Sequence, residues 1–376
     1  MSCTGTHSRR DFRTSPPLVG VALAGGALLA LALVTPAADA WTVVNLHPSG
    51  AIASNVYGAF GNQQVGSILQ VSERRAVLWS GSAASVVDLH PGIWAGSHAF
   101  GTDGTQQTGY VFDYDWFGFT FSHAALWSGS AASFVDLHPA GYYSSEAYAI
   151  ADGQQVGVAS NFAGTYAALW SGSADSFVNL NPPGWFGSHA WGVSSGKQVG
   201  YVFDGTYYAA LWSGTPDSFV NLHPAGWLGS QARAISGTQV VGYVYGTDYM
   251  GRAALWSNAS PDSFVNLHPS GWEDSRAYAV YGGYQVGAVY DGYRFYAALW
   301  NGSAESFVNL HSFLPPEFQG SSSTAYAVAK SGGLLYVAGT GYNSATGRTE
   351  SVLWIIPEPA SLLGLCLALA LFPRRR

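Results

Sequence analysis

The chain has 376 residues and a formal net charge of −7; only 10% of its residues are charged, whereas 15% are aromatic and 47 are glycine. This composition argues against intrinsic disorder, which needs few aromatic residues and many charges. It also argues against nucleic-acid binding, which needs a basic surface. The two cysteines, Cys3 and Cys366, lie near the two ends, so the chain between them is expected to hold no disulfide and no cysteine metal site.

Residues 1–40 are predicted to be a signal peptide. Three arginines precede an apolar stretch over 18–34, and Ala38-Asp39-Ala40 supplies the small residues that a signal peptidase needs, so cleavage is expected after Ala40. The segment 8–12, Ser-Arg-Arg-Asp-Phe, resembles a twin-arginine signal. The alternative is an ordinary secretory signal with a chance arginine pair, and both predict export.

The middle of the chain is an internal repeat marked by Leu-Trp. The first six copies are separated by 42 to 48 residues and the last gap is 54. The tryptophans are Trp79, Trp127, Trp170, Trp212, Trp256, Trp300 and Trp354. Short β-rich runs separated by Gly, Ser, Asp and Pro fill each unit, and no helical period is present. Repeats of this length with four strand-like runs are typical of β-propeller blades.

One unit shows the four expected strands, named a to d. They are residues 188–193, 198–203, 208–212 and 218–222. Their apolar runs are nearly continuous, as expected for strands buried on both faces between neighbouring blades.

The phase of the repeat predicts a closed ring. The chain after residue 40 begins with a d-type strand, Thr42–His47, and the repeat ends with a c-type strand, Val352–Trp354. If the first d strand joins the last a, b and c strands, seven complete blades form and two sheet edges disappear. The predicted fold is therefore an all-β, seven-bladed propeller over 41–356, closed by its N-terminal strand.

The repeat resembles the HAF family of bacterial extracellular repeats. The resemblance rests on an Ala-x-Ala-Ile run at 147–150, Val-Gly at 156–157 and Ala-Leu-Trp at 168–170, and it spans nearly the whole repeat region. It implies no enzymatic activity.

One face of the predicted propeller is rich in aromatic residues. The b–c hairpins and the d-to-a loops must emerge on the same face, and the other face carries small polar turns. The candidate ligand-binding residues on the aromatic face are Trp94, Trp116, Tyr142, Trp185, Tyr207, Trp227, Tyr249, Trp272 and Tyr293. Aromatic rings stack on sugar faces and also serve as protein-binding hot spots. The alternative is that these rings pack between blades and fix the loops.

Histidines and carboxylates give little sign of a catalytic or metal centre. Six histidines recur after strand d: His47, His90, His138, His223, His268 and His311. Equivalent positions on outer strands lie far apart around a ring, so a structural role is expected and no metal or cofactor is predicted. The least repetitive acids lie on or near the aromatic face: Asp113, Asp115, Asp204, Asp248, Asp291, Glu273 and Asp274. Those of the 113–115 hairpin and the 273–274 loop are the candidates for a catalytic pair.

The C-terminus, residues 357–376, resembles a PEP-CTERM sorting signal. Pro357, Glu358 and Pro359 form the motif, an apolar run follows, and Arg374–Arg376 end the chain. The resemblance implies a Gram-negative host, transient membrane contact and processing by an exosortase.

Together these features predict an exported, non-enzymatic protein of the cell surface or extracellular matrix. Its expected ligand is exopolysaccharide or another surface partner, bound through the aromatic face. The alternatives are a secreted polysaccharide-active enzyme that uses the acids just named, and a purely structural coat or adhesin protein.

Overall fold

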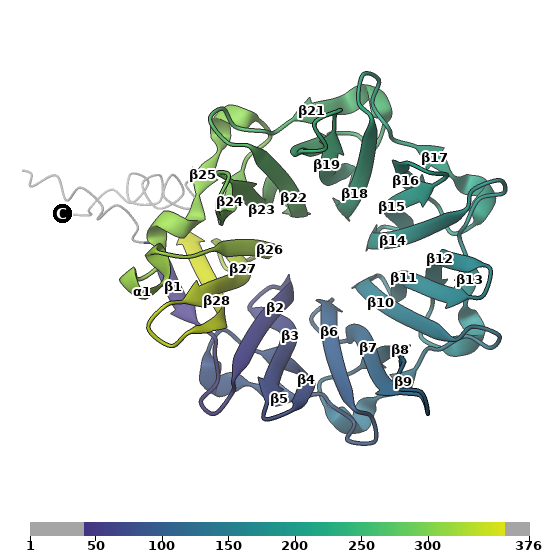
Figure 1. The fold of residues 1–376 in the computed structure, drawn as a ribbon, viewed down its shortest axis with the longest axis horizontal. Coiled ribbons are helices and arrows are strands. Elements are labelled where there is room, and N and C mark those ends of the chain that lie inside the picture. Colours follow the sequence, from purple (N-terminus) through teal and green to yellow (C-terminus); the bar gives the residue numbers. More distant parts are fainter. Residues whose placement is uncertain (1–40, 358–376) are drawn as a thin grey trace, which may run out of the picture. The chain divides into compact units, whose positions relative to one another are not determined.

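The computed structural model describes residues 41–357, which form a ring of seven four-stranded antiparallel sheets (Figure 1). Each sheet is one blade of a β-propeller, as the sequence predicted. The proposed signal peptide with Ala40, and the residues Glu358 and Pro359 of the sorting motif, lie outside the described residues. Pro357 is the last residue of the last strand.

The blades follow one another along the chain, each running from an inner strand to an outer one. Blades 1 to 3 are β2(Ala53–Phe60), β3(Gln63–Gln70), β4(Glu73–Trp79), β5(Val87–Asp88); β6(Gly96–Thr102), β7(Gln107–Tyr114), β8(Thr120–Trp127), β9(Val135–Asp136); and β10(Ser144–Ala151), β11(Gln154–Asn161), β12(Gly164–Trp170), β13(Val178–Asn179). Blades 4 to 6 are β14(Gly187–Ser194), β15(Lys197–Phe203), β16(Tyr207–Trp212), β17(Val220–Asn221); β18(Gly229–Ser236), β19(Gln239–Tyr245), β20(Gly251–Trp256), β21(Phe264–Asn266); and β22(Asp274–Tyr281), β23(Tyr284–Tyr290), β24(Phe295–Trp300), β25(Val308–Asn309). Blade 7 is β26(Ser323–Ser331), β27(Leu334–Asn343), β28(Arg348–Pro357) and β1(Thr42–Asn45).

Short helical turns connect some of the strands. One-turn 3-10 helices precede the outer strands of blades 1 to 6, and a longer connection enters blade 7. They are η1(Ala83–Ser85), η2(Ala131–Ser133), η3(Ala174–Ser176), η4(Pro216–Ser218), η5(Pro261–Ser263), η6(Ala304–Ser306), η7(Leu310–Phe313) and α1(Pro316–Gln319). These turns shorten the outer strand: the run predicted over 218–222 pairs only at Val220 and Asn221. Within residues 41–357, no helix is long and apolar enough to cross a membrane.

The ring closes between the two ends of the repeat region. β1 pairs antiparallel with β28, and Val43 lies opposite Trp354. Trp354 Nε1 also donates a hydrogen bond of 3.0 Å to the Leu310 carbonyl of blade 6. A strand from the start of the chain therefore completes the last blade and covers the outer edge of β28, which would otherwise be unpaired.

The core consists of apolar layers between adjacent blades. The seven repeat tryptophans have 0% exposure, and each is part of a cluster shared with a neighbouring blade. Full burial of one such ring removes roughly 200 Å² from water and contributes about 5 kcal/mol before entropy costs. Each Leu-Trp repeat thus contributes its tryptophan to one apolar layer between two blades.

Every inner strand carries a β-bulge at the same position. The register shifts across one residue in each blade: Tyr57, Phe100, Tyr148, Trp191, Arg233, Tyr278 and Tyr326. Such an extra residue is left out of the ladder and its side chain is redirected. In this propeller the bulges turn one side chain per blade toward the centre of the ring.

A glycine in the second strand accommodates each bulge. In blade 4, a Cβ on Gly200 would overlap the carbonyl oxygen of His189, which precedes the bulge. The equivalent glycines are Gly66, Gly109, Gly157, Gly242, Gly287 and Gly339. The Val-Gly pair of the repeat is therefore explained by close backbone approach, which only glycine permits.

Candidate ligand-binding channel

The seven bulge residues form a closed ring around the propeller axis. Each contacts the next: the separations between ring centroids, or from the Arg233 guanidinium carbon to a centroid, run from 3.8 to 5.9 Å around the whole circle. Six members are aromatic, and the seventh is Arg233. Tyr148 stacks on Trp191 with centroids 4.3 Å apart.

This ring is the waist between two chambers, since all seven of its residues line both. The chamber nearer the b–c hairpins, called here the upper chamber, has a volume of about 400 Å³ and also involves Tyr110 and Glu146. The lower chamber, of about 390 Å³, lies beside the a–b hairpins and includes Asp152 and Ser195. Volumes of this size are in the range of small-ligand sites.

Glu146 is the carboxylate that lines the upper chamber. The Tyr148 hydroxyl donates a hydrogen bond of 2.8 Å to Glu146 Oε2, and the Ser122 hydroxyl donates one of 3.2 Å to Oε1. Burial, reinforced by the Glu146 charge, raises the pKa of Tyr148 well above its usual value. Tyr148 is therefore a neutral donor that fixes the carboxylate in the chamber.

Two histidines lie in the same layer of inner strands as Glu146. Burial, with a smaller effect of the Arg74 charge, lowers the pKa of His98 to about 3. Burial and the Arg233 charge lower the pKa of His189 to about 4. Both rings stack against tyrosines of the second strand, Tyr110 and Tyr201. Both imidazoles are therefore neutral at pH 7 and add no charge to this layer.

The sequence reasoning missed this ring, although a signal for it was present. The bulge residue is the variable position between two small or aliphatic residues, Ala-x-Ala in four of the repeats, and it is aromatic in six of seven repeats. An extended strand alternates its side chains between faces, so the sequence alone assigned this position to a blade interface. The bulge moves it to the channel instead.

The predicted aromatic residues of the d-to-a loops pack onto the blades. Trp185, Trp227 and Trp272 lie 5.6 to 6.0 Å from Phe219, Phe264 and Phe307, with edge-to-face geometry. Tyr142 lies 5.0 Å from Phe177, and Trp94 packs against the cluster that contains Phe134. These five rings are half-buried and extend the inter-blade core.

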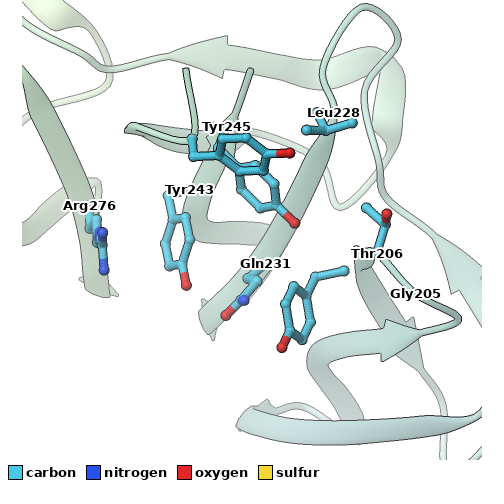
Figure 2. A pocket seen from close by; sticks show the side chains of 9 residues that line it. Gly205, Thr206, Leu228, Gln231, Tyr243, Tyr245 and Arg276 are labelled. Carbon is cyan, nitrogen blue, oxygen red and sulfur yellow. The ribbon is translucent and has the colours of Figure 1, made fainter. Parts of the chain in front are cut away.

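The predicted hairpin aromatics remain at the surface. Trp116 is 96% exposed and Tyr293 90% exposed, in hairpins of blades 2 and 6. Tyr207 and Tyr249 line a pocket of about 400 Å³ on the hairpin side of blades 4 to 6. Figure 2 shows Gln231, Tyr243 and Arg276 lining the same pocket from three neighbouring strands. As ligand contacts, all nine predicted residues stay predictions.

The repeated histidines join strand d of one blade to strand a of the next. In blade 4, His223 Nε2 donates to the Trp227 carbonyl at 3.2 Å, so its Nδ1 accepts the hydrogen bond of 2.9 Å from the Ser230 hydroxyl. Ser230 Oγ also accepts the Ala209 backbone N–H at 2.9 Å. The same His–Ser contact recurs at the other five: His47–Ser54, His90–Ser97, His138–Ser145, His268–Ser275 and His311–Ser323.

The structure does not bring the four predicted acids together. Asp113 and Asp115 belong to the hairpin of blade 2, where Asp115 Oδ1 accepts the backbone N–H groups of the turn. Asp274 begins blade 6, is buried and pairs with Arg276. Among the described residues, no group of three or more His, Cys, Asp or Glu side chains is placed to hold a metal ion.

Comparison with known proteins yields solved propellers of low sequence identity. No family model matches the chain, and no curated protein does. The β-propeller domain of the Trilobed protease from Pyrococcus furiosus has a TM-score of 0.52 and 9% identity, covering 81% of this chain and 94% of that domain. That domain has an open velcro topology, whereas in this chain β1 closes the last blade.

Two whole peptidases match through their propellers. The acylaminoacyl peptidase of Pyrococcus horikoshii gives a TM-score of 0.51 and 10% identity, covering 80% of this chain and 51% of that one. The puromycin-hydrolyzing peptidase of Mycobacterium tuberculosis gives a TM-score of 0.52 and 11% identity, covering 83% of this chain and 55% of that one. This chain thus spans about half the length of these peptidases, and identities this low establish the fold alone.

The predicted function is corrected by these findings. The prediction that the propeller binds exopolysaccharide or a surface partner through a ring of loop aromatics is wrong for two reasons. The loop rings are packed into the blades rather than gathered into one exposed surface. The propellers of similar fold belong to peptidases. The alternative of a polysaccharide-active enzyme loses its basis, because its acids lie on separate blades.

Proposed function

We propose that this propeller binds peptides in its central channel. The observation that carries the proposal is the closed ring of six aromatic side chains and Arg233, one from each blade, with Glu146 lining the chamber above it. The seven ring side chains are set by the fold before any ligand arrives, because each is held by a bulge and by contact with its two neighbours, and Glu146 is fixed by its hydrogen bonds from Tyr148 and Ser122. A preformed site of this kind loses little entropy on binding.

The chemistry of the channel suits a peptide better than other ligand classes. Six aromatic rings offer apolar surface for side chains, whereas Glu146 and Arg233 offer one charge of each sign for the ends or side chains of the ligand. A nucleic acid would need a mainly basic surface. A purely apolar ligand would leave both charges desolvated without a partner, which is costly.

The similar propellers come from peptidases, which makes a peptide the first class of ligand to test. Cleavage by this propeller itself is not part of the proposal. The recurrent Ser–His pairs have the hydrogen-bond polarity of an activated nucleophile, but Ser230 has 0% exposure and its oxygen already accepts a backbone N–H. A hydroxyl that is buried and already hydrogen-bonded to the backbone cannot reach and attack a substrate carbonyl.

Calorimetric titration of the purified chain with a library of short peptides tests the proposal. We expect saturable binding by a subset of peptides, lost on Trp191→Ala, which removes a ring member between Tyr148 and Arg233. Trp116→Ala is the matched control, because Trp116 lies at an exposed hairpin. Absence of binding by every peptide, or equal binding by both variants, would overturn the channel as the site.

We also propose that the protein is exported and processed at both ends. The support is the sequence of residues 1–40 and the PEP-CTERM-like segment 357–376, with the export machinery and an exosortase as processing partners. β28 ends at Pro357, so cleavage beyond this residue leaves every blade whole. Mass spectrometry of the protein from a Gram-negative host with an exosortase should give a mature chain that starts at Trp41 and ends near Pro357. A full-length chain in the cytoplasm would contradict this proposal.

A further inference from the structure

Arg233 differs from the other six members of the ring and from the other arginines around it. Its guanidinium lies 3.8 Å from the centroid of Trp191 and 5.8 Å from that of Tyr278. Within residues 41–357 it makes no ion pair with a carboxylate. Arg276, on the inner strand of the next blade, is by contrast paired with the buried Asp274 at 3.1 Å.

The contact with Trp191 leaves the N–H donors of Arg233 available, since within residues 41–357 its guanidinium makes no hydrogen bond to another group. A guanidinium bound through its flat face keeps its N–H donors in the plane, pointing outward from the stack. Those donors match the two oxygens of a carboxylate, which they bind in a bidentate manner. Trp191 thus orients the cation without using the atoms that would bind an anion.

The surroundings of Arg233 favour an anionic partner of low total charge. Aromatic side chains replace water on both of its sides, so the unpaired cation is costly and a counter-charge is strongly attracted. Glu146 lines the same upper chamber and repels a ligand that carries several acidic groups. One carboxylate on an otherwise apolar peptide satisfies both conditions.

We propose that Arg233 binds a carboxylate of the peptide ligand, either at the C-terminus or on an acidic side chain. This inference rests on the proposed function, since it names the group by which the peptide is recognised. The aromatic members of the ring contact the apolar side chains next to that carboxylate, and the Arg233 edge fixes its position at the waist.

Three forms of one binding peptide separate the two sources of the carboxylate. They are the free acid, the C-terminal amide, and the amide with one aspartate in place of a neutral residue. We expect the free acid to bind about 10- to 100-fold more tightly than the plain amide, the range for hydrogen bonds to a charged group. Recovery of binding by the aspartate form identifies side-chain recognition; its failure identifies the terminal carboxylate.

Arg233→Gln tests whether this residue is responsible. The variant should remove the preference for the charged peptide and leave binding of the plain amide nearly unchanged, whereas Arg233→Lys should keep part of the preference because it keeps the charge. Arg294→Gln is the matched control, since Arg294 lies in an exposed hairpin of blade 6. Thermal unfolding of each variant shows whether the fold survives.

The outcomes separate the inference from the function it rests on. If no peptide form binds the unmodified protein, the proposed function fails. If the free acid, the plain amide and the aspartate amide all bind equally, or if Arg233→Gln folds and keeps the full preference for a charged form, peptide binding stands and the role of Arg233 is overturned.

Discussion

Two sets of aromatic residues recur at equivalent positions in most blades, and they have opposite places in the molecule. The loop set, represented by Trp185 and Trp272, packs against phenylalanines of the outer strand and joins the core. The channel set, represented by Tyr148 and Trp191, forms the ring around the axis. In the sequence both sets are aromatic positions in a repeat, with five aromatic residues in the loop set and six in the channel set.

The difference comes from the backbone rather than from residue type. Loop residues follow a short outer strand, and their rings cover the next blade because that buries apolar area. Channel residues are the extra residues of bulges, so they leave the interface between blades. Residue type and recurrence therefore do not separate the two sets, whereas the irregularity of the inner strand marks the candidate site.

The largest expected effect comes from removing the space that the bulge needs. Gly200→Ala places a Cβ against the His189 carbonyl, a backbone atom that cannot move without shifting the strand. We expect a loss of about 3 kcal/mol or more in the free energy of unfolding, together with loss of peptide binding. Urea denaturation measures the first and calorimetry the second.

The control for this substitution is Gly320→Ala. Gly320 has a negative φ of −84° and no atom within 4 Å of an added Cβ, so the unfolding free energy should change by less than about 0.5 kcal/mol. Equal stability of the two variants would show that the second-strand glycine does not support the bulge.

The second largest change in the free energy of unfolding is expected when a packed loop ring is removed, and it should exceed the change at an exposed ring. Trp272→Ala removes contacts with Tyr296 and Phe307 and should lower the free energy of unfolding by about 2–3 kcal/mol. Trp116→Ala, at a position that is 96% exposed, should change it by less than about 0.5 kcal/mol. Similar urea midpoints for both would contradict the structural role of the loop set.

Acid should destabilise both regions through their histidines. Burial lowers the pKa of the inner-strand residues His98 and His189 to about 3 and about 4, and it lowers the pKa of the loop residue His223 as well. The unfolded chain therefore binds more protons than the folded one below pH 6.5. Stability is complete above pH 6.5 and falls steadily as the pH decreases toward 4.

Melting temperatures measured from pH 8 to pH 4 test this dependence. His98→Gln should flatten the curve between pH 6.5 and pH 4, because it removes one of the groups that must stay neutral in the folded protein. A curve that is level across this range would mean that the histidines accept protons without cost in the folded state.

The smallest effect on stability is expected for the channel ring itself. Trp191→Ala opens the side chain's space to the channel instead of leaving a sealed cavity, so the loss should be about 1 kcal/mol, mainly from the stacks on Tyr148 and Arg233. Binding of peptide should nevertheless be lost. A loss of more than about 3 kcal/mol in the free energy of unfolding would show that Trp191 is a packing residue like those of the loop set.

Much of the fold follows from the sequence because every blade repeats the same pattern of strands and turns. The Leu-Trp period gives the number of inter-blade layers, and the phase that begins at Thr42 and ends after Trp354 gives the closure later seen in β1 and β28. The short outer strands were overestimated, since residues 216–218 form a helical turn that the apolar run 218–222 conceals.

The sequence by itself determined the blade count and the joining of the two ends, since these depend on local strand patterns and on their order along the chain. Only the tertiary structure decided which aromatic residues meet. Residues 57 and 326 are far apart in sequence and become neighbours because the ring closes, and Arg233 reaches the axis because a bulge turns it there. Periodicity fixes which face of an ideal strand a side chain takes, but a bulge reverses that assignment and ring closure sets its neighbours.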